Sequence, residues 1–303
     1  MILVFGSLNM DIVVPVPALP KAGETVLSPS YLTAPGGKGS NQAVAAARAG
    51  AEVVLVGCVG RDPYGDTLLE IVSAEGIDSR AIDHVELPTG VAVVAVADDG
   101  ENQIIVCVGA NGATREDQVS DAMLEAASTV LLQMEVPLRE VFTFAGRAKR
   151  AGRRVILNTA PAGPIMPETV DVVIMNEGEA CQVARAIGLD ESEPSAIARR
   201  LAASHELTVV TTLGGAGAVA VTPAGGWRVG ALPIVPRDTT GAGDAFCGVL
   251  AASLDRGDRL DTAMHRASVA GSLACLTPGA MPSLPRRETI DARLAELAPA
   301  QPL

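Results

Sequence analysis

The chain has 303 residues, of which 48% are hydrophobic and 19% are charged, so a disordered chain is excluded and a substantial core is expected. Acidic residues outnumber basic residues by 35 to 23, and the formal charge of -12 argues against a protein that binds nucleic acid. The length is typical of two domains, or of one large α/β domain with an insertion.

The sequence predicts a cytoplasmic protein without a membrane partner. Residues 2–5 are apolar with no basic segment before them, and Gly6 interrupts the run before it reaches the length of a signal sequence or a membrane span. The 5 cysteines form no C-x-x-C pair, and the 3 histidines lie in separate regions without the spacing of metal ligands. We therefore expect reduced thiols that fill the core, and no zinc site.

Short β-branched runs alternate with helical patterns along most of the chain, which is typical of βα units on a parallel sheet. Strands are predicted over 1–6, 53–59, 129–134, 153–158, 170–175 and 207–213. Helices are predicted over 41–49, 65–75, 115–127, 138–151, 178–187 and 194–204. A hairpin over 216–222 and 227–232 follows, and a helical C-terminal third begins at Gly241.

Two segments break this alternation. Residues 9–35 have no helical period, and residues 89–108 are predicted to form two strands around a turn at 98–102. We interpret the two segments as one small sheet. Its strands 91–97 and 104–108 are apolar at successive positions, so both faces are expected to be covered, one by a ligand and the other by a second subunit. A purely structural hairpin accounts for the pattern equally well.

The glycine-rich stretch 34–41 is not a Walker A loop, because Lys38 is followed by Gly39 rather than by Ser or Thr. The first strand is not followed by G-x-G-x-x-G either, which disfavours a dinucleotide site. Gly36 and Gly37 could let a ligand approach the backbone before a helix whose free N–H groups begin near Asn41. A plain N-capped helix explains the same residues about as well.

The segment 237–246 predicts an anion-binding site. Gly241 and Gly243 open an apolar helix, so the amides of residues 241–244 are expected to converge at the positive end of the helix dipole. Asp244 lies among them, and we expect the helix terminus to lower its pKa, so that it stays ionised and can accept a proton. The alternative is a carboxylate that only stabilises the start of the helix.

Two further pairs of polar residues are suited to ligands. Asn176 and Glu179 follow an apolar strand, where open α/β sheets bind ligands, and Glu179 could hold magnesium through water, although an acidic N-cap is the simpler alternative. Asn9 and Asp11 are two residues apart in an extended stretch and therefore share a face, which suits sugar hydroxyls.

In their order along the chain, these segments resemble the ribokinase-like family of carbohydrate kinases. The resemblance is carried by residues 6–11, 23–25, 36–43, 89–90, 109–111, 158–161, 176–179, 212–214 and 238–244. It implies an α/β fold with a doubly wound, mostly parallel sheet flanked by helices and a small inserted β-sheet lid. It divides the chain into a core of residues 1–8, 36–88 and 109–303 and a lid of residues 9–35 and 89–108.

The resemblance also implies an activity and its cofactors. Family members transfer phosphate from ATP to a sugar hydroxyl, with Mg²⁺ and with K⁺ as an activating ion, and a homodimer through the lid is expected. The residues that match the sugar contacts are Asn9, Asp11, Gly37, Lys38, Asn41, Glu135 and Asp244. Asp244 also matches the general base, and Gly241, Ala242 and Gly243 match the anion hole.

The resemblance assigns two further groups of residues. Those that match nucleotide contacts are Asn176, Glu179, Thr212, Gly214, Gly217, Gly243 and Ser268, with Glu179 also directed to magnesium through water. Those that match the monovalent-cation site are Asp238, Thr240, Ala274, Thr277, Gly279 and Ser283. The chain departs from the family pattern at Thr277 and Pro278, where basic residues stand in the members it matches best.

The scarcity of aromatic residues bears on the substrate. They make up 2% of the chain, and none falls at Asn9 to Asp11 or at Gly36 and Gly37, whereas a nucleobase is normally flanked by aromatic side chains. D-ribose phosphorylated at its terminal hydroxyl is therefore the favoured activity. A fructokinase, a 2-keto-3-deoxygluconate kinase or a nucleoside kinase remains an alternative. A sugar-binding module without catalysis is a further one, opposed by the intact run 241–244.

Overall fold

The computed structural model describes all residues, 1–303, and its main feature is a ten-stranded sheet with the order β14-β13-β12-β11-β10-β9-β8-β1-β4-β5. The strands are β1 (Ile2–Phe5), β4 (Val53–Gly60), β5 (Asp78–Val85), β8 (Thr129–Leu132), β9 (Arg154–Asn158), β10 (Val172–Asn176), β11 (Thr208–Thr212), β12 (Ala218–Thr222), β13 (Gly225–Val229) and β14 (Gln301–Pro302). The strands from β5 to β11 run parallel, and β12, β13 and β14 continue the sheet in antiparallel fashion.

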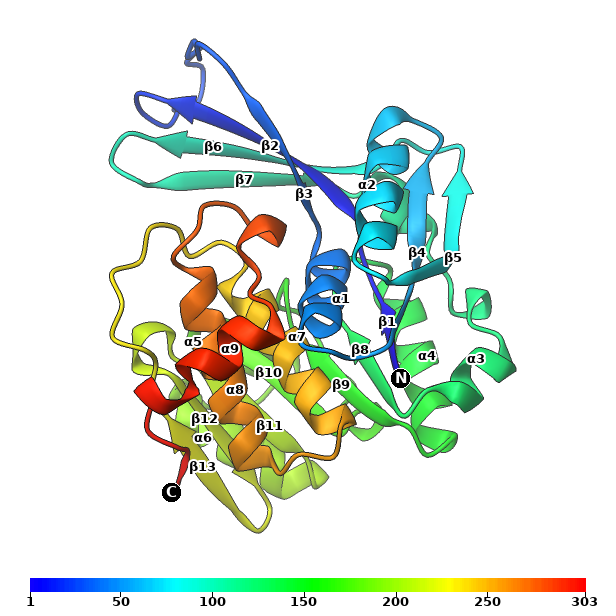
Figure 1. The fold of residues 1–303 in the computed structure, drawn as a ribbon, viewed down its shortest axis with the longest axis vertical. Coiled ribbons are helices and arrows are strands. Elements are labelled where there is room, and N and C mark those ends of the chain that lie inside the picture. The colour runs from blue at the N-terminus through cyan, green and yellow to red at the C-terminus, as the bar shows by residue number, and fades with distance from the viewer.

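Helices cover both faces of this sheet, as the doubly wound fold predicts (Figure 1). They are α1 (Lys38–Arg48), α2 (Pro63–Ala74), α3 (Asp121–Ala126), α4 (Leu138–Arg150), α5 (Glu177–Ala186), α6 (Pro194–His205), α7 (Ala242–Asp255), α8 (Leu260–Ala274) and α9 (Arg287–Arg293). The core on one face is formed with α1, α2, α7, α8 and α9, and the core on the other with α3 to α6. Alternate residues of β1 enter the two cores, Ile2 and Val4 one and Leu3 and Phe5 the other. None of the helices combines the length and apolarity that a membrane crossing requires.

Most predicted elements are confirmed, and the largest differences concern β5, the segment 115–127 and the start of α1. Strand β5 was not predicted, because at the edge of the sheet it carries exposed charged side chains such as Arg80, which hide its apolar pattern. The predicted helix 115–127 is divided into a single 3-10 turn, Glu116–Gln118, and α3, where the Ser120 side chain accepts a hydrogen bond from the Met123 N–H at 3.2 Å. Helix α1 begins at Lys38, three residues before the predicted start.

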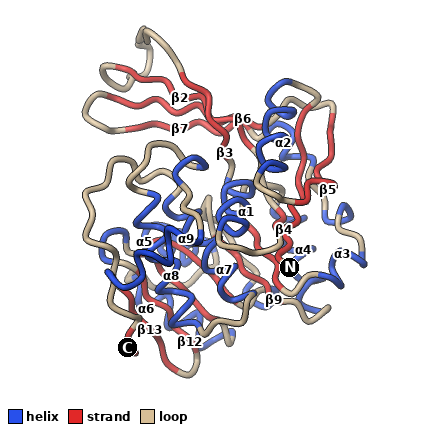
Figure 2. Tube along the Cα trace, viewed as in Figure 1, coloured by secondary structure: helices blue, strands red, loops and turns tan.

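The two segments that break the alternation do form one small sheet, with the order β3-β2-β6-β7. Its strands are β2 (Asn9–Val16), β3 (Leu32–Gly36), β6 (Gly90–Ala97) and β7 (Asn102–Cys107). Figures 1 and 2 show this sheet projecting from the helical body as an arm. In the single chain every residue of the outer strand β7 is exposed, so the expected cover of both faces would have to come from a ligand and a second subunit.

The register of this sheet tells which of its residues share a face. Asp11 pairs with Ala92, and Ala92 pairs with Val106, so these three side chains point to the same side. Ile12 pairs with Val93, which pairs with Ile105, and these point to the opposite side.

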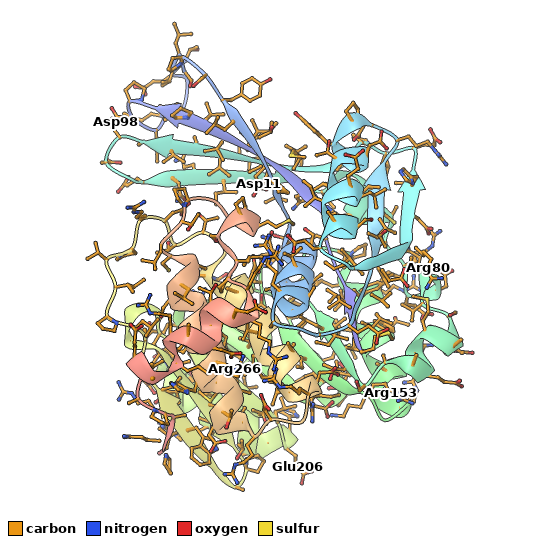
Figure 3. All side chains as sticks on the ribbon, in the orientation of Figure 1. Asp11, Arg80, Asp98, Arg153, Glu206 and Arg266 are labelled. Carbon is orange, nitrogen blue, oxygen red and sulfur yellow. The ribbon has the colours of Figure 1, made fainter.

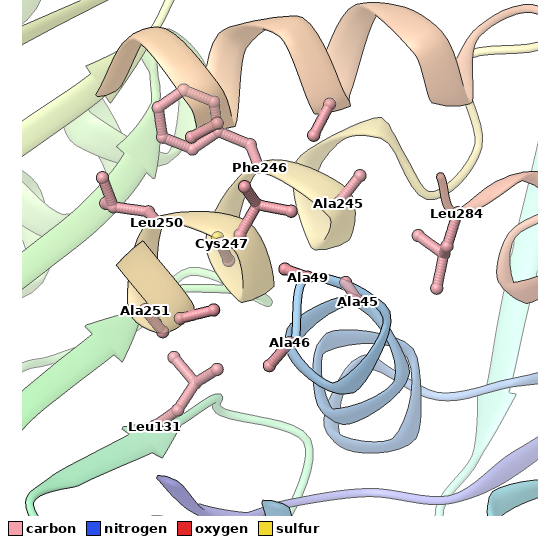
Figure 4. Close-up of a cluster of buried hydrophobic side chains, with 14 of the residues drawn as sticks. Ala45, Ala46, Ala49, Leu131, Ala245, Phe246, Cys247, Leu250, Ala251 and Leu284 are labelled. Atoms are coloured by element: carbon pink, nitrogen blue, oxygen red, sulfur yellow. The ribbon is translucent and has the colours of Figure 1, made fainter. Parts of the chain in front are cut away.

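Small residues bring α1 and α7 unusually close. A Cβ added to Gly248 of α7 would lie 2.5 Å from the Cβ of Ala45 and 2.5 Å from the carbonyl oxygen of Gln42, both in α1. Figure 4 shows the same crossing with Ala45, Ala46 and Ala49 facing α7. This close approach places the first turn of α1 directly against Asp244 at the start of α7.

Candidate active site

Asp244 lies at the centre of the candidate site and is 8% exposed. Its two carboxylate oxygens accept hydrogen bonds from the side-chain amides of α1, Oδ2 from Asn41 Nδ2 and Oδ1 from Gln42 Nε2, each at 2.9 Å. The contacts join residues about 200 positions apart in the chain. The carboxylate is therefore fixed in orientation from the side of α1.

Burial raises the pKa of Asp244 above its ordinary value, although Lys38 and the two amides act in the opposite direction. The expected lowering of this pKa by the helix terminus is therefore wrong. The reason is that desolvation disfavours the charged form more than these neighbours favour it. A carboxylate with a raised pKa is a stronger base once it is ionised.

Three carboxylates and one ammonium group surround this position. Burial raises the pKa of Asp11 to about 7, and Glu135 and Asp244 add to the effect while Lys38 opposes it. Burial acts to lower the pKa of Lys38, but Asp244, Glu135 and Glu179 outweigh it, and the pKa is raised. Lys38 therefore stays charged and is the counter-ion of the cluster. Figure 3 shows Asp11 where the small sheet meets the body.

The start of α1 is closed by protein groups. Glu135 Oε2 accepts hydrogen bonds from the Lys38 N–H at 3.0 Å and from the Ser7 hydroxyl at 2.6 Å. The N–H groups of Gly39 and Ser40 donate to the hydroxyl and carbonyl oxygens of Ser7 at 3.2 Å and 2.9 Å. The prediction that free N–H groups begin near Asn41 is therefore wrong, because the helix starts earlier and its first donors are used.

Gly36 and Gly37 make room for the strand that carries the polar pair rather than for a ligand. A Cβ on Gly36 would lie 2.2 Å from Asp11 Oδ2, and a Cβ on Gly37 would lie 2.7 Å from the backbone nitrogen of Asn9. Gly37 also has a φ of 93°, in the left-handed region that favours glycine. Both glycines allow Asn9 and Asp11 to lie against the start of α1.

The start of α7 is open, in contrast to that of α1. The N–H groups of Gly241, Gly243 and Asp244 donate to no protein group, whereas that of Ala242 donates to the Thr239 carbonyl at 3.2 Å. A Cβ on Gly243 would meet nothing within 4 Å. A helix N-terminus with three free amides beside open space can bind an anion, as the sequence predicted. Of the four amides expected there, only that of Ala242 is used by the protein.

Two cavities adjoin at Gly243. The first has a volume of 230 Å³, and the residues that line it include Lys38, Asn158, Asn176, Glu179, Thr212, Gly241, Gly243, Asp244 and Cys247. The second is a groove of 510 Å³, and its lining includes Thr212, Gly214, Gly217, Ala242, Gly243, Phe246 and Ser268. A larger hollow of 660 Å³ between β5 and α3 contains none of the predicted site residues and is not part of the site.

Asn176 and Glu179 cap the start of α5 and also line the first cavity. The Asn176 N–H donates to Glu179 Oε2 and the Glu179 N–H donates to Asn176 Oδ1, each at 2.8 Å, so they form a capping box. Both also line the first cavity, and Glu179 Oε1 has no protein donor. The chain has no cluster of three or more His, Cys, Asp or Glu side chains that could hold a metal by themselves. A single carboxylate of this kind fits Mg²⁺ that arrives with phosphate and water ligands.

Two loops meet at Asp238. Its Oδ1 accepts from the Thr240 N–H at 2.9 Å and from the Thr240 hydroxyl at 2.6 Å, and its Oδ2 accepts from the Gly279 N–H at 2.7 Å. Burial acts to raise the pKa of Asp238, but these hydrogen bonds outweigh it, and the pKa is lowered. The other predicted cation ligands make local contacts, the Thr277 N–H with the Ala274 carbonyl at 3.4 Å and the Ser283 hydroxyl with the Ala280 carbonyl at 2.7 Å.

Several polar residues at the site were not singled out from the sequence. Gln42 and Asn111 lie inside segments that carry the family resemblance, but the resemblance assigned them no role. Gln133 and Asn158 contact Gln42, Asn111 contacts Asn9, and Ser7 contacts Glu135. Ser268, predicted at the nucleotide, lines the groove and donates its hydroxyl hydrogen to the Gly230 carbonyl. The signal that could have indicated Gln42 is its position next to Asn41, in a helix whose other buried residues are small or apolar.

Comparisons with known proteins agree with this geometry. Residues 1–287 match the pfkB family carbohydrate kinase model. The chain is 36% identical over 299 residues to a ribokinase of Haemophilus influenzae, covering 95% of this chain and 96% of that protein. Among solved structures, a ribokinase of Thermotoga maritima has a TM-score of 0.90 and 31% identity, covering 97% of this chain and 99% of that one. A ribokinase of Arabidopsis thaliana complexed with ribose and ATP has a TM-score of 0.87 and 31% identity, covering 97% and 98%.

Proposed function

The chain belongs to the pfkB family of carbohydrate kinases, and from this premise we propose that it transfers the γ-phosphoryl group of ATP to the terminal hydroxyl of D-ribose. The observation that carries the proposal is the buried carboxylate of Asp244, one residue beyond Gly243, where the two cavities adjoin. The names of the relatives, ribokinases that include a complex with ribose and ATP, support ribose as the acceptor.

In this mechanism Asp244 is the general base. The hydroxyl oxygen of the sugar forms a bond to the γ-phosphorus, its proton passes to the Asp244 carboxylate, and the bond between the γ-phosphorus and the bridging oxygen breaks to release ADP. The free N–H groups of Gly241, Gly243 and Asp244 stabilise the charge on the transferring group. Phosphoryl transfer depends mainly on positioning and charge stabilisation, which this arrangement provides.

We assign the sugar to the space between the small sheet and the start of α1. Asn9, Asp11, Lys38, Asn41 and Glu135 present amide, carboxylate and ammonium groups there, with Gly37 at the turn between them. Supporting this assignment, Glu135, Asp244 and Lys38 are close enough to add to or oppose the effect of burial on the pKa of Asp11. Residues 9–35 and 89–108 form the lid over this space, and residues 1–8, 36–88 and 109–303 form the core.

The nucleotide is assigned to the groove lined by Thr212, Gly214, Gly217, Gly243 and Ser268. Its phosphates would extend toward Asn176 and Glu179 in the first cavity, where Glu179 Oε1 would hold Mg²⁺ through water. When bound, the ion supplies positive charge to the phosphates. The protein itself contributes Lys38, which the neighbouring carboxylates keep charged beside the same cavity.

Three further features belong to the proposal. A monovalent cation, K⁺, would be held near Asp238, Thr240 and Gly279 and would order the loops that join at Asp238. Two chains form a homodimer through the small sheet, because β7 leaves apolar residues such as Ile105 exposed in the single chain. The compartment is the cytoplasm, where ATP is available and the five cysteines, all free, remain reduced.

Substitution of the base tests the proposal. Asp244→Asn keeps the shape of the side chain and removes its proton acceptor, so turnover with ribose and MgATP should fall by about 10²–10⁴ while ribose still binds. Turnover is measured by ADP release and binding by calorimetry. Turnover within a few-fold of the parent protein would contradict the role of Asp244 and with it the proposed reaction.

A further inference from the structure

We propose that Gln42 is a positioning residue that fixes the Asp244 carboxylate through a buried chain of side-chain amides. The inference rests on the proposed function, in which Asp244 is the base. Gln42 is 0% exposed and lines neither cavity, so it can influence the reaction only through other residues. Its Nε2 donates to Asp244 Oδ1 and to Asn158 Oδ1, each at 2.9 Å, and its Oε1 accepts from Gln133 Nε2 at 2.8 Å.

The Ile174 carbonyl in β10 sets the orientation of the three linked amide side chains, Asn158, Gln42 and Gln133. Asn158 Nδ2 donates to the Ile174 carbonyl at 3.2 Å, which turns Asn158 Oδ1 toward Gln42. Gln42 therefore donates one hydrogen of its NH₂ group to Asn158 Oδ1, and the second hydrogen of that group points to Asp244. A reversed Gln42 amide would place its oxygen against both Asn158 Oδ1 and the Asp244 carboxylate, which is repulsive.

Gln133 closes the chain on its far side. Its Nε2 occupies the Gln42 oxygen, while its own Oε1 is buried without a hydrogen-bond partner. That oxygen lies where a Cβ on Gly6 would be, at 2.0 Å, so Gly6 makes room for it. A buried oxygen without a hydrogen-bond partner lowers the stability of the folded state. Here the unpaired oxygen belongs to Gln133, whose NH₂ group keeps the Gln42 amide in one orientation.

The consequence for Asp244 is a donor that is always present on one oxygen. A hydrogen bond donated to a carboxylate favours its ionised form, so Gln42 partly offsets the burial that raises the Asp244 pKa. The other charged or titratable groups that act on Asp244 come from four elements and one loop. They are Asp11 in β2, Lys38 in α1, Glu179 in α5, Cys247 in α7 and Glu135 after β8. None of them contacts Gln42 through a hydrogen bond.

The test is the pH dependence of kcat in Gln42→Met, which keeps the length of the side chain and removes its donors and acceptor. Loss of a hydrogen bond to a charged group should move the acidic limb of kcat upward by about one to two pH units. At pH values below the limb kcat should fall by about tenfold for each pH unit of the shift. The KM for ribose should change less than about threefold, because Gln42 does not line the site. Using kcat rather than kcat/KM separates this limb from the ionisation of Asp11 in the free enzyme.

Two variants accompany it. Gln133→Met removes the donor to Gln42 and leaves Asp244 and Gln42 intact, so its limb should move in the same direction by a smaller amount, and it decides the question if Gln42→Met does not fold. Gln118→Met is the control, because Gln118 is a partly buried glutamine whose amide bonds the Gly57 carbonyl and the Arg115 N–H, away from Asp244. Its pH profile should equal that of the parent protein.

The outcomes separate this inference from the proposed function. Unchanged limbs in Gln42→Met and Gln133→Met, together with an inactive Asp244→Asn, would overturn the positioning role and leave Asp244 as the base. Turnover by Asp244→Asn close to that of the parent would instead overturn the proposed function itself. A fall in kcat that is equal at all pH values would also count against the positioning role, because it would show that the Asp244 pKa does not depend on Gln42.

Discussion

Asn111 donates a hydrogen bond of 2.7 Å from its Nδ2 to Oδ1 of Asn9. The same side chain accepts from the Leu8 N–H and donates to the Leu8 carbonyl. Asn9 begins β2, and Asn111 follows β7, so this contact joins the places where the chain enters and leaves the small sheet. Because Asn111 donates to the Asn9 oxygen, the Asn9 amide is held in one orientation and its NH₂ group remains free to donate to a sugar hydroxyl.

Asn111→Asp should therefore weaken sugar binding. The variant can still accept from the Leu8 N–H but loses both donors, so the Asn9 amide is free to reverse. We expect the KM for ribose to rise by about tenfold, with a smaller change in kcat. Steady-state kinetics of a folded variant decides the point, and a KM equal to that of the parent protein would show that Asn111 does not orient Asn9.

The raised pKa of Asp11, about 7, makes a prediction for stability. The folded state holds this proton up to about pH 7, whereas the unfolded state loses it near the ordinary pKa of an aspartate, 3.8, so the free energy of unfolding falls as the pH rises between these values. Asp11→Asn removes the charge and should stabilise the protein by about 1–3 kcal/mol above pH 7 and little near pH 4. Thermal unfolding at pH 4.5 and pH 8 measures the difference. An equal effect at both values would contradict the assigned ionisation.

The register of the small sheet predicts which face mediates assembly. Ile105 points away from the side that carries Asp11, whereas Ile104 pairs with Val94 and lies on the Asp11 side. Ile105→Asp should therefore convert a dimer to a monomer at micromolar concentration, and Ile104→Asp should leave the dimer in place. Light scattering compares the two variants with the parent. A parent protein that is already monomeric would remove the dimer from the account, and the opposite pattern would reverse the faces.

Potassium should act through the loops at Asp238. The ion would order the segment before α7 and so fix the amides of Gly241 and Gly243 without contacting the sugar. Turnover in potassium should exceed that in sodium or tetramethylammonium at equal ionic strength, and Asp238→Ala should abolish the difference. Identical rates in all three salts would mean that the hydrogen bonds from Thr240 and Gly279 already order these loops.

Much of the fold follows from local patterns in the sequence, and the failures have physical causes. Buried parallel strands such as β4 are continuously apolar and were predicted, whereas the edge strand β5 alternates with charged residues and was not. The faces of the small sheet could not be assigned in advance, because both are apolar and only the pairing of β2 with β6 and β7 distinguishes them.

The site was predictable where a motif carries it and not where long-range contacts decide. The run from Gly241 to Asp244 indicated an anion site, which the free amides of α7 support. The pKa of Asp244 was predicted in the wrong direction, because its burial depends on the close crossing of α1 and α7 at Gly248 and Ala45. The amide chain through Gln42 joins three segments that are distant in sequence, so no local pattern predicts it.

The proposed reaction places phosphate on the terminal hydroxyl of ribose. The most direct measurement is ADP release with MgATP and D-ribose, 2-deoxyribose, fructose or a nucleoside as acceptor, with the position of the phosphate in the product determined by NMR. We predict that D-ribose has the highest kcat/KM, that 2-deoxyribose is about 100-fold poorer because it leaves polar groups of the site unpaired, and that the product is ribose 5-phosphate. A higher kcat/KM for another acceptor, or phosphate on another hydroxyl of ribose, would contradict the account.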